Sequence, residues 1–147
     1  ARPARAQPGA ASLFSLARHC GQAFAGRVVA NVPKPATPDA FEGKPLVMHV
    51  RGCDAPAQEL RIPFHVGEDR SRTWVLTRTP DGLRLKHDHR HRDGSPDAVT
   101  MYGGDTAAPG STVRHFVYEL SRPGGRLFRV EFDLSKPVPP PPPPWGD

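Results

Sequence analysis

The sequence predicts an all-β protein, a single antiparallel up-and-down β-barrel of about seven or eight strands with one N-terminal α-helix. Three observations predict this fold class. From residue 28 onward, apolar residues recur at every second position, which is typical of half-buried strands. Turn residues separate these segments, and no ten-residue helical pattern lies between them, which argues against a parallel βαβ architecture. An antiparallel sheet with one apolar face must hide that face, and closure into a barrel does so.

The chain of 147 residues has the size of one domain. We expect residues 12–135 to form a single β-barrel domain. Residues 1–11 are small and basic without a hydrophobic period, so we expect a disordered N-terminal segment. Residues 136–147, KPVPPPPPPWGD, are predicted to be a disordered proline-rich tail with polyproline II character, because proline cannot donate a backbone hydrogen bond.

The first expected element is an amphipathic helix over residues 12–24. Ser12 can cap its start, and Gly26 can end it in a left-handed conformation. Its apolar residues recur at steps of three and four: Leu13, Leu16, Ala17, Cys20 and Phe24.

Short strands follow the helix. They are expected at residues 28–32, 46–51, 60–66, 73–79, 83–91, 98–102, 112–120 and 128–134. Pro80-Asp81-Gly82 and Pro123-Gly124-Gly125 have the composition of hairpin turns. Gly103-Gly104-Asp105 is expected to interrupt the chain after the strand at residues 98–102.

The formal charge is +5 and the pI is about 9.8. This charge permits binding to nucleic acid or an anionic surface, but arginines alternate with Asp and Glu along most of the chain. We therefore expect no nucleic-acid partner, and a basic surface used in the cell envelope or in protein interaction remains an alternative. No run approaches the roughly 20 apolar residues of a membrane-spanning helix, so no transmembrane segment is expected. A monomer is the favoured state.

Two cysteines, Cys20 and Cys53, are the only thiols of the chain. They are too few for a thiolate metal site, and we expect a disulfide between them that contributes roughly 3–4 kcal/mol; two buried reduced thiols are the alternative. Ala4-Arg5-Ala6 has the small-x-small pattern that often precedes a signal-peptidase cut, although an Ala/Arg/Pro-rich segment also produces it by chance.

Two stretches resemble known proteins. The run FHVGEDRSRTWVLTRTPDGLRLKHDHRHRDGSPDAVTMYGGDT, residues 64–106, resembles an uncharacterised family of small exported bacterial proteins. The segment CGQAFAGRVV, residues 20–29, is similar to that family and to the helix-then-glycine opening of lipocalin-like (calycin) barrels. It departs from lipocalins after Gly26, where Arg27 and Val28 replace the usual Trp. The resemblance implies a periplasmic or secreted protein with a calycin-like barrel, and it implies no activity for any residue.

The strongest candidate site is LRLKHDHRHRDG, residues 83–94. Leucines and histidines share one strand face in this segment, so imidazoles point toward the barrel lumen or mouth if the leucines point inward. A face that changes from apolar to imidazole suits a ligand cavity near an open end. The candidate ligand-binding residues are Trp74, Leu85, His87, His89 and Tyr102.

The same histidines could hold a metal ion. Alternate strand residues are about 6.6 Å apart, so two imidazoles can converge on one zinc ion. His87 and His91 are about 13 Å apart on a straight strand, so His87, His89 and His91 can share one ion only if the strand bends. His49 and His65 fall on the outward face. A divalent transition metal such as zinc is therefore a candidate cofactor, and a merely solvated strand end is the structural alternative.

Catalytic motifs do not emerge from the sequence. It contains no Gly-x-Ser-x-Gly elbow, no phosphate-binding glycine loop before a helix and no His-Glu-x-x-His pair. Glu68, Asp69 and Asp88 are carboxylates of acid–base type, but ion pairing with arginine explains them equally. We therefore expect a non-enzymatic, exported β-barrel that binds a small-molecule ligand. The alternatives are a metal-binding protein and an envelope or interaction protein.

Overall fold

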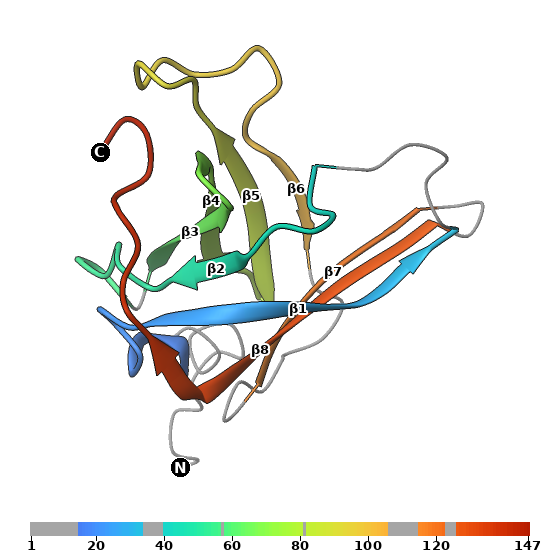
Figure 1. The fold of residues 1–147 in the computed structure, drawn as a ribbon. Helices are drawn as coiled ribbons and strands as arrows, with labels where there is room; N and C mark the ends of the chain where they lie inside the picture. The colour runs from blue at the N-terminus through green and yellow to red at the C-terminus, as the bar shows by residue number, and fades with distance from the viewer. Residues whose placement is uncertain (1–14, 34–39, 57, 81, 106–114, 123–125) are drawn as a thin grey trace.

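The computed structural model describes residues 15–33, 40–56, 58–80, 82–105, 115–122 and 126–147. These residues form one eight-stranded sheet in which neighbouring strands are antiparallel. The sheet curls into a half-barrel (Figure 1). The prediction of an antiparallel all-β fold is confirmed. The N-terminal segment at residues 1–11, which we expected to be disordered, lies outside the described residues.

The strand order is β6-β5-β4-β3-β2-β1-β8-β7. Strands adjacent in sequence pair with each other, and the first pairs with the last, as in an up-and-down barrel. The exception within the described residues is β6 and β7, which are adjacent in sequence but do not pair. The barrel is therefore open between them. The strands are β1 (Ala23–Val32), β2 (Leu46–His49), β3 (Glu59–Val66), β4 (Asp69–Arg78), β5 (Leu83–His89), β6 (Tyr102–Asp105), β7 (His115–Arg122) and β8 (Arg126–Val138).

The N-terminal helix is much shorter than the predicted span of residues 12–24. In the structure, residues 15–17 are helical, and β1 already begins at Ala23. Gly21 has a φ of +87° and separates the two elements. Phe24 pairs with Met48 in the sheet and is buried as a residue of β1, not as part of an apolar helix face. The prediction was wrong here because the buried residues at the start of β1 continue the spacing of three and four residues that we interpreted as one helix.

The strand β6 also differs from the expected position. It occupies Tyr102–Asp105 rather than residues 98–102, and the two glycines lie inside it. A side chain on Gly103 would collide with the carbonyl of Leu85 on β5. Asp105 accepts hydrogen bonds from Nε and Nη2 of Arg84, at 2.8 and 3.1 Å. The glycines therefore permit close approach of two strands, where we expected a break.

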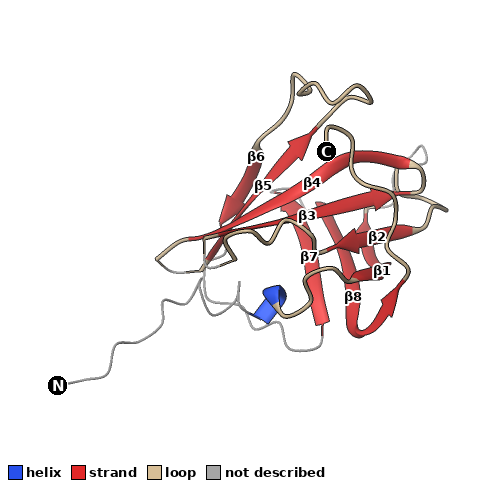
Figure 2. Cartoon of the chain, turned by 90° about the vertical axis from the view of Figure 1, so that its left-hand side faces the viewer, coloured by secondary structure: helices blue, strands red, loops and turns tan. Residues whose placement is uncertain are grey.

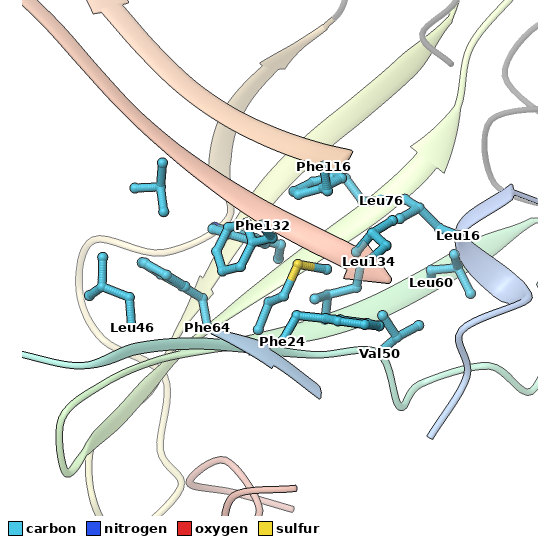
Figure 3. Close-up of a cluster of buried hydrophobic side chains, with 14 of the residues drawn as sticks. Leu16, Phe24, Leu46, Val50, Leu60, Phe64, Leu76, Phe116, Phe132 and Leu134 are labelled. Atoms are coloured by element: carbon cyan, nitrogen blue, oxygen red, sulfur yellow. The ribbon is translucent and has the colours of Figure 1, made fainter. Parts of the chain in front are cut away.

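The concave face of the sheet holds the hydrophobic core (Figure 3). Aromatic rings fill its centre. The ring of Trp74 is stacked between those of Phe64 and Tyr118, with centroid distances of 4.6 and 4.8 Å. Trp74 is fully buried, and Phe132 meets its ring edge-on. The largest fully buried side chains are Trp74, Phe24, Phe64, Phe132, Leu16, Met48, Leu60, Ile62, Val50, Val66 and Val130.

The predicted disulfide is present between Cys20 and Cys53, with a Cα–Cα distance of 6.4 Å. It ties the turn before β1 to the segment that follows β2. No helix in the described part of the chain has the length and apolar character needed to cross a membrane.

The C-terminal residues pack against the sheet, although we expected a disordered tail from residue 136. Pro137 and Val138 pair with Phe24 and Ala23 of β1. Residues 139–147, which we call the C-terminal strap, then run past the ends of β2 and β3 toward β4 and β5 (Figure 2). Proline lacks the donor N–H but keeps its carbonyl, so a proline-rich segment can be held by donors of the sheet.

Candidate functional site

The predicted inward direction of His87 agrees with its contacts. His87 lies opposite Trp74 in the β4–β5 register and is buried. Its Nε2 atom is 2.9 Å from the Tyr118 hydroxyl on β7, and its ring stacks on Tyr102 of β6 at 4.7 Å. The imidazole therefore links β5 to both strands that flank the open side of the half-barrel.

Burial makes the His87–Tyr118 pair electrically neutral. The pKa of His87 is lowered to about 4, chiefly by burial and to a lesser extent by the nearby Arg72 guanidinium. Burial raises the pKa of Tyr118 to about 12. At neutral pH both groups are uncharged and hydrogen-bonded to each other, so they close the core at this position.

The other residues of the histidine stripe diverge from His87. The ring of His89 lies between Ser71 and Asp97: Nε2 is 3.4 Å from Ser71 Oγ, and Nδ1 is 3.1 Å from Asp97 Oδ2. His91 is exposed. The structure thus does not bring the three imidazoles to one point. In the described ranges, no group of three or more His, Cys, Asp or Glu side chains is placed to hold a metal ion.

The predicted ligand-binding residues line packed space. Trp74 is enclosed by aromatic rings, and Leu85 packs against the core from a half-buried position. Tyr102 is 47% exposed and covers His87. Of the five predicted residues, Trp74 and His87 both contact Tyr118, and Tyr102 stacks on His87. His89 instead turns toward Ser71 and Asp97. The predicted clustering is thus partly present, and side chains occupy its centre.

A polar cleft lies on the opposite, convex face of the sheet. We call it the outer cleft. It has a volume of about 350 Å³ and lies between β3, β4 and β5 on one side and the strap on the other. Its lining residues are Arg51, Gly52, Asp54, Arg61, Pro63, Thr73, Asp88, Arg90, Pro144, Trp145, Gly146 and Asp147.

Asp88 is the buried carboxylate of the outer cleft, with 6% of its surface exposed. It accepts a hydrogen bond from Arg61 Nη1 at 3.0 Å and another from Arg90 Nε at 2.9 Å. Burial acts to raise the pKa of Asp88, but the hydrogen bonds and charges of Arg90 and Arg61 hold this pKa below its ordinary value. The carboxylate is therefore ionised and fixes two guanidinium groups at the cleft.

Backbone contacts hold the strap over this face. The Trp145 backbone N–H donates to the Arg70 carbonyl at 3.0 Å, and Arg70 Nη1 donates to the Pro143 carbonyl at 2.8 Å. Gly94 and Gly146 approach so closely that a side chain on Gly94 would lie 2.8 Å from the Gly146 Cα. These contacts require a bare backbone on both sides.

Two side chains of the strap bind arginines. The Arg92 guanidinium lies 5.4 Å from the centre of the Trp145 ring, a cation–π contact. Arg51 Nη2 is 2.6 Å from Asp147 Oδ2. A carboxylate is therefore bound to an arginine at the edge of the outer cleft.

Sequence reasoning did not identify the outer cleft. The alternation placed His65 on the outward face, but this residue is only 2% exposed. The pKa of His65 is lowered to about 4, chiefly by burial and to a lesser extent by Arg70, which also binds the strap. The sequence signal for the cleft is the outward-facing row Arg61, Pro63 and His65. From the sequence alone this row resembles an ordinary solvated face, because the sequence does not show that the strap lies above it.

No protein-family model, curated protein sequence or solved structure matches this chain significantly. The chemistry of the site is therefore the basis for an inference about function.

Proposed function

We propose that this chain is an exported, non-enzymatic binding protein, and that it holds a small molecule with a carboxylate group in the outer cleft. The observation that carries this proposal is the carboxylate of Asp147 on the Arg51 guanidinium at 2.6 Å. An added carboxylate would meet the same chemistry on the neighbouring arginines of the cleft.

The arginines suit such a ligand. A guanidinium group has five N–H donors in a planar fork that matches a carboxylate. Arg61 and Arg90 are fixed by Asp88 and are 43% and 37% exposed at their side chains, so parts of both groups face water. Rigid cationic groups that need no rearrangement favour binding of an anion. The net charge of +5 attracts anions to the whole surface.

The size of the cleft supports a small ligand. Its volume of about 350 Å³ lies at the lower end of the range for small-molecule sites, roughly 300–1,000 Å³. Trp145 and Pro63 add apolar walls, and Thr73 adds a hydroxyl. The concave face is a weaker candidate, because aromatic side chains fill the space around Trp74.

Export is supported by the disulfide between Cys20 and Cys53, because such bonds persist in oxidising compartments. The resemblance of residues 64–106 to small exported bacterial proteins points the same way.

Titration with acetate, succinate, citrate and benzoate, followed by amide NMR spectra of the full chain, tests the proposal. We expect shifts at Arg61, Asp88 and Arg90 for at least one of these anions. Arg61→Gln should weaken binding by about tenfold through loss of a charge-assisted contact. Arg84→Gln is the matched control, because Arg84 also lies on β5 but forms an exposed ion pair with Asp105 of β6, outside the cleft.

Two results would contradict this proposal. One is that none of the four anions shifts any cleft amide at millimolar concentration. The other is that the shifts gather on the concave face around His87 and Tyr118, which would return the ligand to the half-barrel interior.

A further inference from the structure

The strap is anchored at its tip, beyond a stiff spacer. Residues 139–144 are six consecutive prolines, and a run of this kind is extended and resists folding back. The contacts with the sheet involve Pro143, Trp145, Gly146 and Asp147 at the far end. A rigid arm with an anchor at its end can reach a groove on its own sheet or an identical groove on another molecule.

The chain has a suitable hinge directly before the arm. In the β1–β8 register, Phe132 faces Gly26 and Pro137 faces Phe24, so four residues of β8 oppose the single Ala25. This bulge changes the direction of β8 (Figure 1). The bulge redirects the strap toward β4 and so determines which part of the protein the tip of the strap contacts.

The bulge is held by short-range bonds. Asp133 Oδ1 accepts from the Ser135 backbone N–H at 2.9 Å and from its hydroxyl at 2.6 Å, and these groups are exposed. Leu134 is buried in the core, whereas Ser135 and Lys136 are exposed. A change of backbone direction at Ser135 and Lys136 would therefore leave the core intact.

We propose that two copies of this chain exchange their C-terminal straps, so that the Trp145–Asp147 tip of each copy occupies the groove formed by Arg51, Arg70 and Arg92 of the other. With the hinge at Ser135 and Lys136, the exchange carries Pro137 and Val138 along with the strap. Every contact of residues 137–147 can form within one chain or between two chains, so only the effective concentration of this segment separates the two states. The exchanged dimer therefore gains population as protein concentration rises. Each outer cleft keeps a strap as its wall, so this proposal goes beyond the proposed ligand binding and does not depend on it.

Charge reversal at the Arg51–Asp147 pair tests the exchange in the full chain. In Arg51→Asp, an acidic residue at position 51 meets the chain's own Asp147; in Asp147→Arg, Arg51 meets a basic residue at position 147. Each variant alone therefore has a mismatched pair, both within one molecule and between identical molecules. In a mixture of the two, the exchanged heterodimer matches both pairs at once. The double variant Arg51→Asp/Asp147→Arg restores the pair within one chain and is the control.

We expect native mass spectrometry of an equimolar mixture, with one variant labelled by nitrogen-15, to give a heterodimer. Its fraction should exceed the dimer fraction of either variant alone, and that of the double variant, by about tenfold, because two repulsive contacts become attractive ones. Far-UV circular dichroism and thermal melting establish that each variant is folded.

A mixture of folded variants that contains no more dimer than its separate components would overturn the exchange. A synthetic peptide of residues 136–147 provides a second readout on the unaltered chain. If the peptide shifts the Arg70 and Arg92 amides while the mixture stays monomeric, the groove accepts a free peptide but not a second copy, and the proposal is likewise rejected.

Discussion

The two faces of this sheet bury their side chains in different ways. On the concave face, stacked aromatic rings around Trp74 exclude water and leave neutral groups such as His87 paired with Tyr118. On the convex face, charged groups around Asp88 are covered by a strap from the C-terminal end of the chain. The same alternation along β5 supplies both faces, since His87 and Asp88 are neighbours. An inward direction therefore identifies a face of the sheet, but it does not make that face hollow.

The largest effect should come from removing the aromatic ring at the centre of the concave face. Trp74→Ala leaves a void among Phe64, Tyr118 and Phe132, and large aromatic truncations of this kind cost about 3–5 kcal/mol. Trp145→Ala is the matched control on the convex face, where the cation–π contact with Arg92 contributes about 1 kcal/mol or less. Urea unfolding of both variants measures the difference. Equal losses would show that the two faces are not energetically distinct.

The second effect concerns the disulfide, which joins segments that flank β1 and β2. Cys20→Ser/Cys53→Ser should lower the free energy of unfolding by roughly 3–4 kcal/mol, because the bond closes a loop with a sequence separation of 33. The same urea experiment with and without a reducing agent provides the measurement. Reduction of the unaltered chain should reproduce the loss, while the serine variant should not respond. A reducing agent that leaves the unaltered chain unchanged would contradict this expectation.

The acid stability of the chain tests both faces together. His87 on the concave face and His65 on the convex face have folded pKa values of about 4, against an ordinary value of 6.5, chiefly because both are buried. The unfolded chain therefore takes up protons first as the pH falls. Stability is complete above pH 6.5, decreases between pH 6.5 and 4, and levels off for these groups below pH 4. The loss should be on the order of 2 kcal/mol for each histidine, with partial hydration of the rings included.

Substitution assigns the acid effect to each face. His87→Phe should remove the concave contribution, His65→Phe should remove the convex one, and the His65→Phe/His87→Phe variant should lose both. Urea midpoints between pH 7 and 4 measure all three. A smaller slope should persist in the His65→Phe/His87→Phe variant, because burial also lowers the pKa of His49. A slope as steep as that of the unaltered chain would place the responsible groups elsewhere.

Much of the fold could be predicted from local patterns. The period of two located most of the strands, and the parity of β5 assigned Leu85 and His87 to the same inward side. Local patterns failed where two elements share apolar residues: Leu16 is helical and Phe24 belongs to β1, yet their spacing fits a single helix. They failed again at Gly103, because the close approach of β5 and β6 depends on the partner strand.

The outer cleft could not be predicted from the sequence, because its parts meet only through long-range contacts. Arg70 and Pro143 are 73 residues apart, and Arg51 meets Asp147 at the other end of the chain. A proline-rich tail normally indicates disorder, and no local signal shows where such a segment will land. The histidine stripe attracted attention because it is continuous in sequence, whereas the cleft is assembled in space.

The smallest effect should distinguish the covered convex face from the exposed surface beside it. Asp88→Asn removes the charge that fixes Arg61 and Arg90 and should cost on the order of 1 kcal/mol, because the amide is neutral and has one acceptor oxygen where the carboxylate has two. Asp105→Asn alters an exposed ion pair between Asp105 of β6 and Arg84 of β5, so no measurable change is expected. Urea unfolding at pH 7 compares the two variants, and 0.5 M salt should leave the Asp88 effect largely intact because water has little access to that carboxylate. If both substitutions are silent, the strap does not shield this face, and the outer cleft is an ordinary solvated surface.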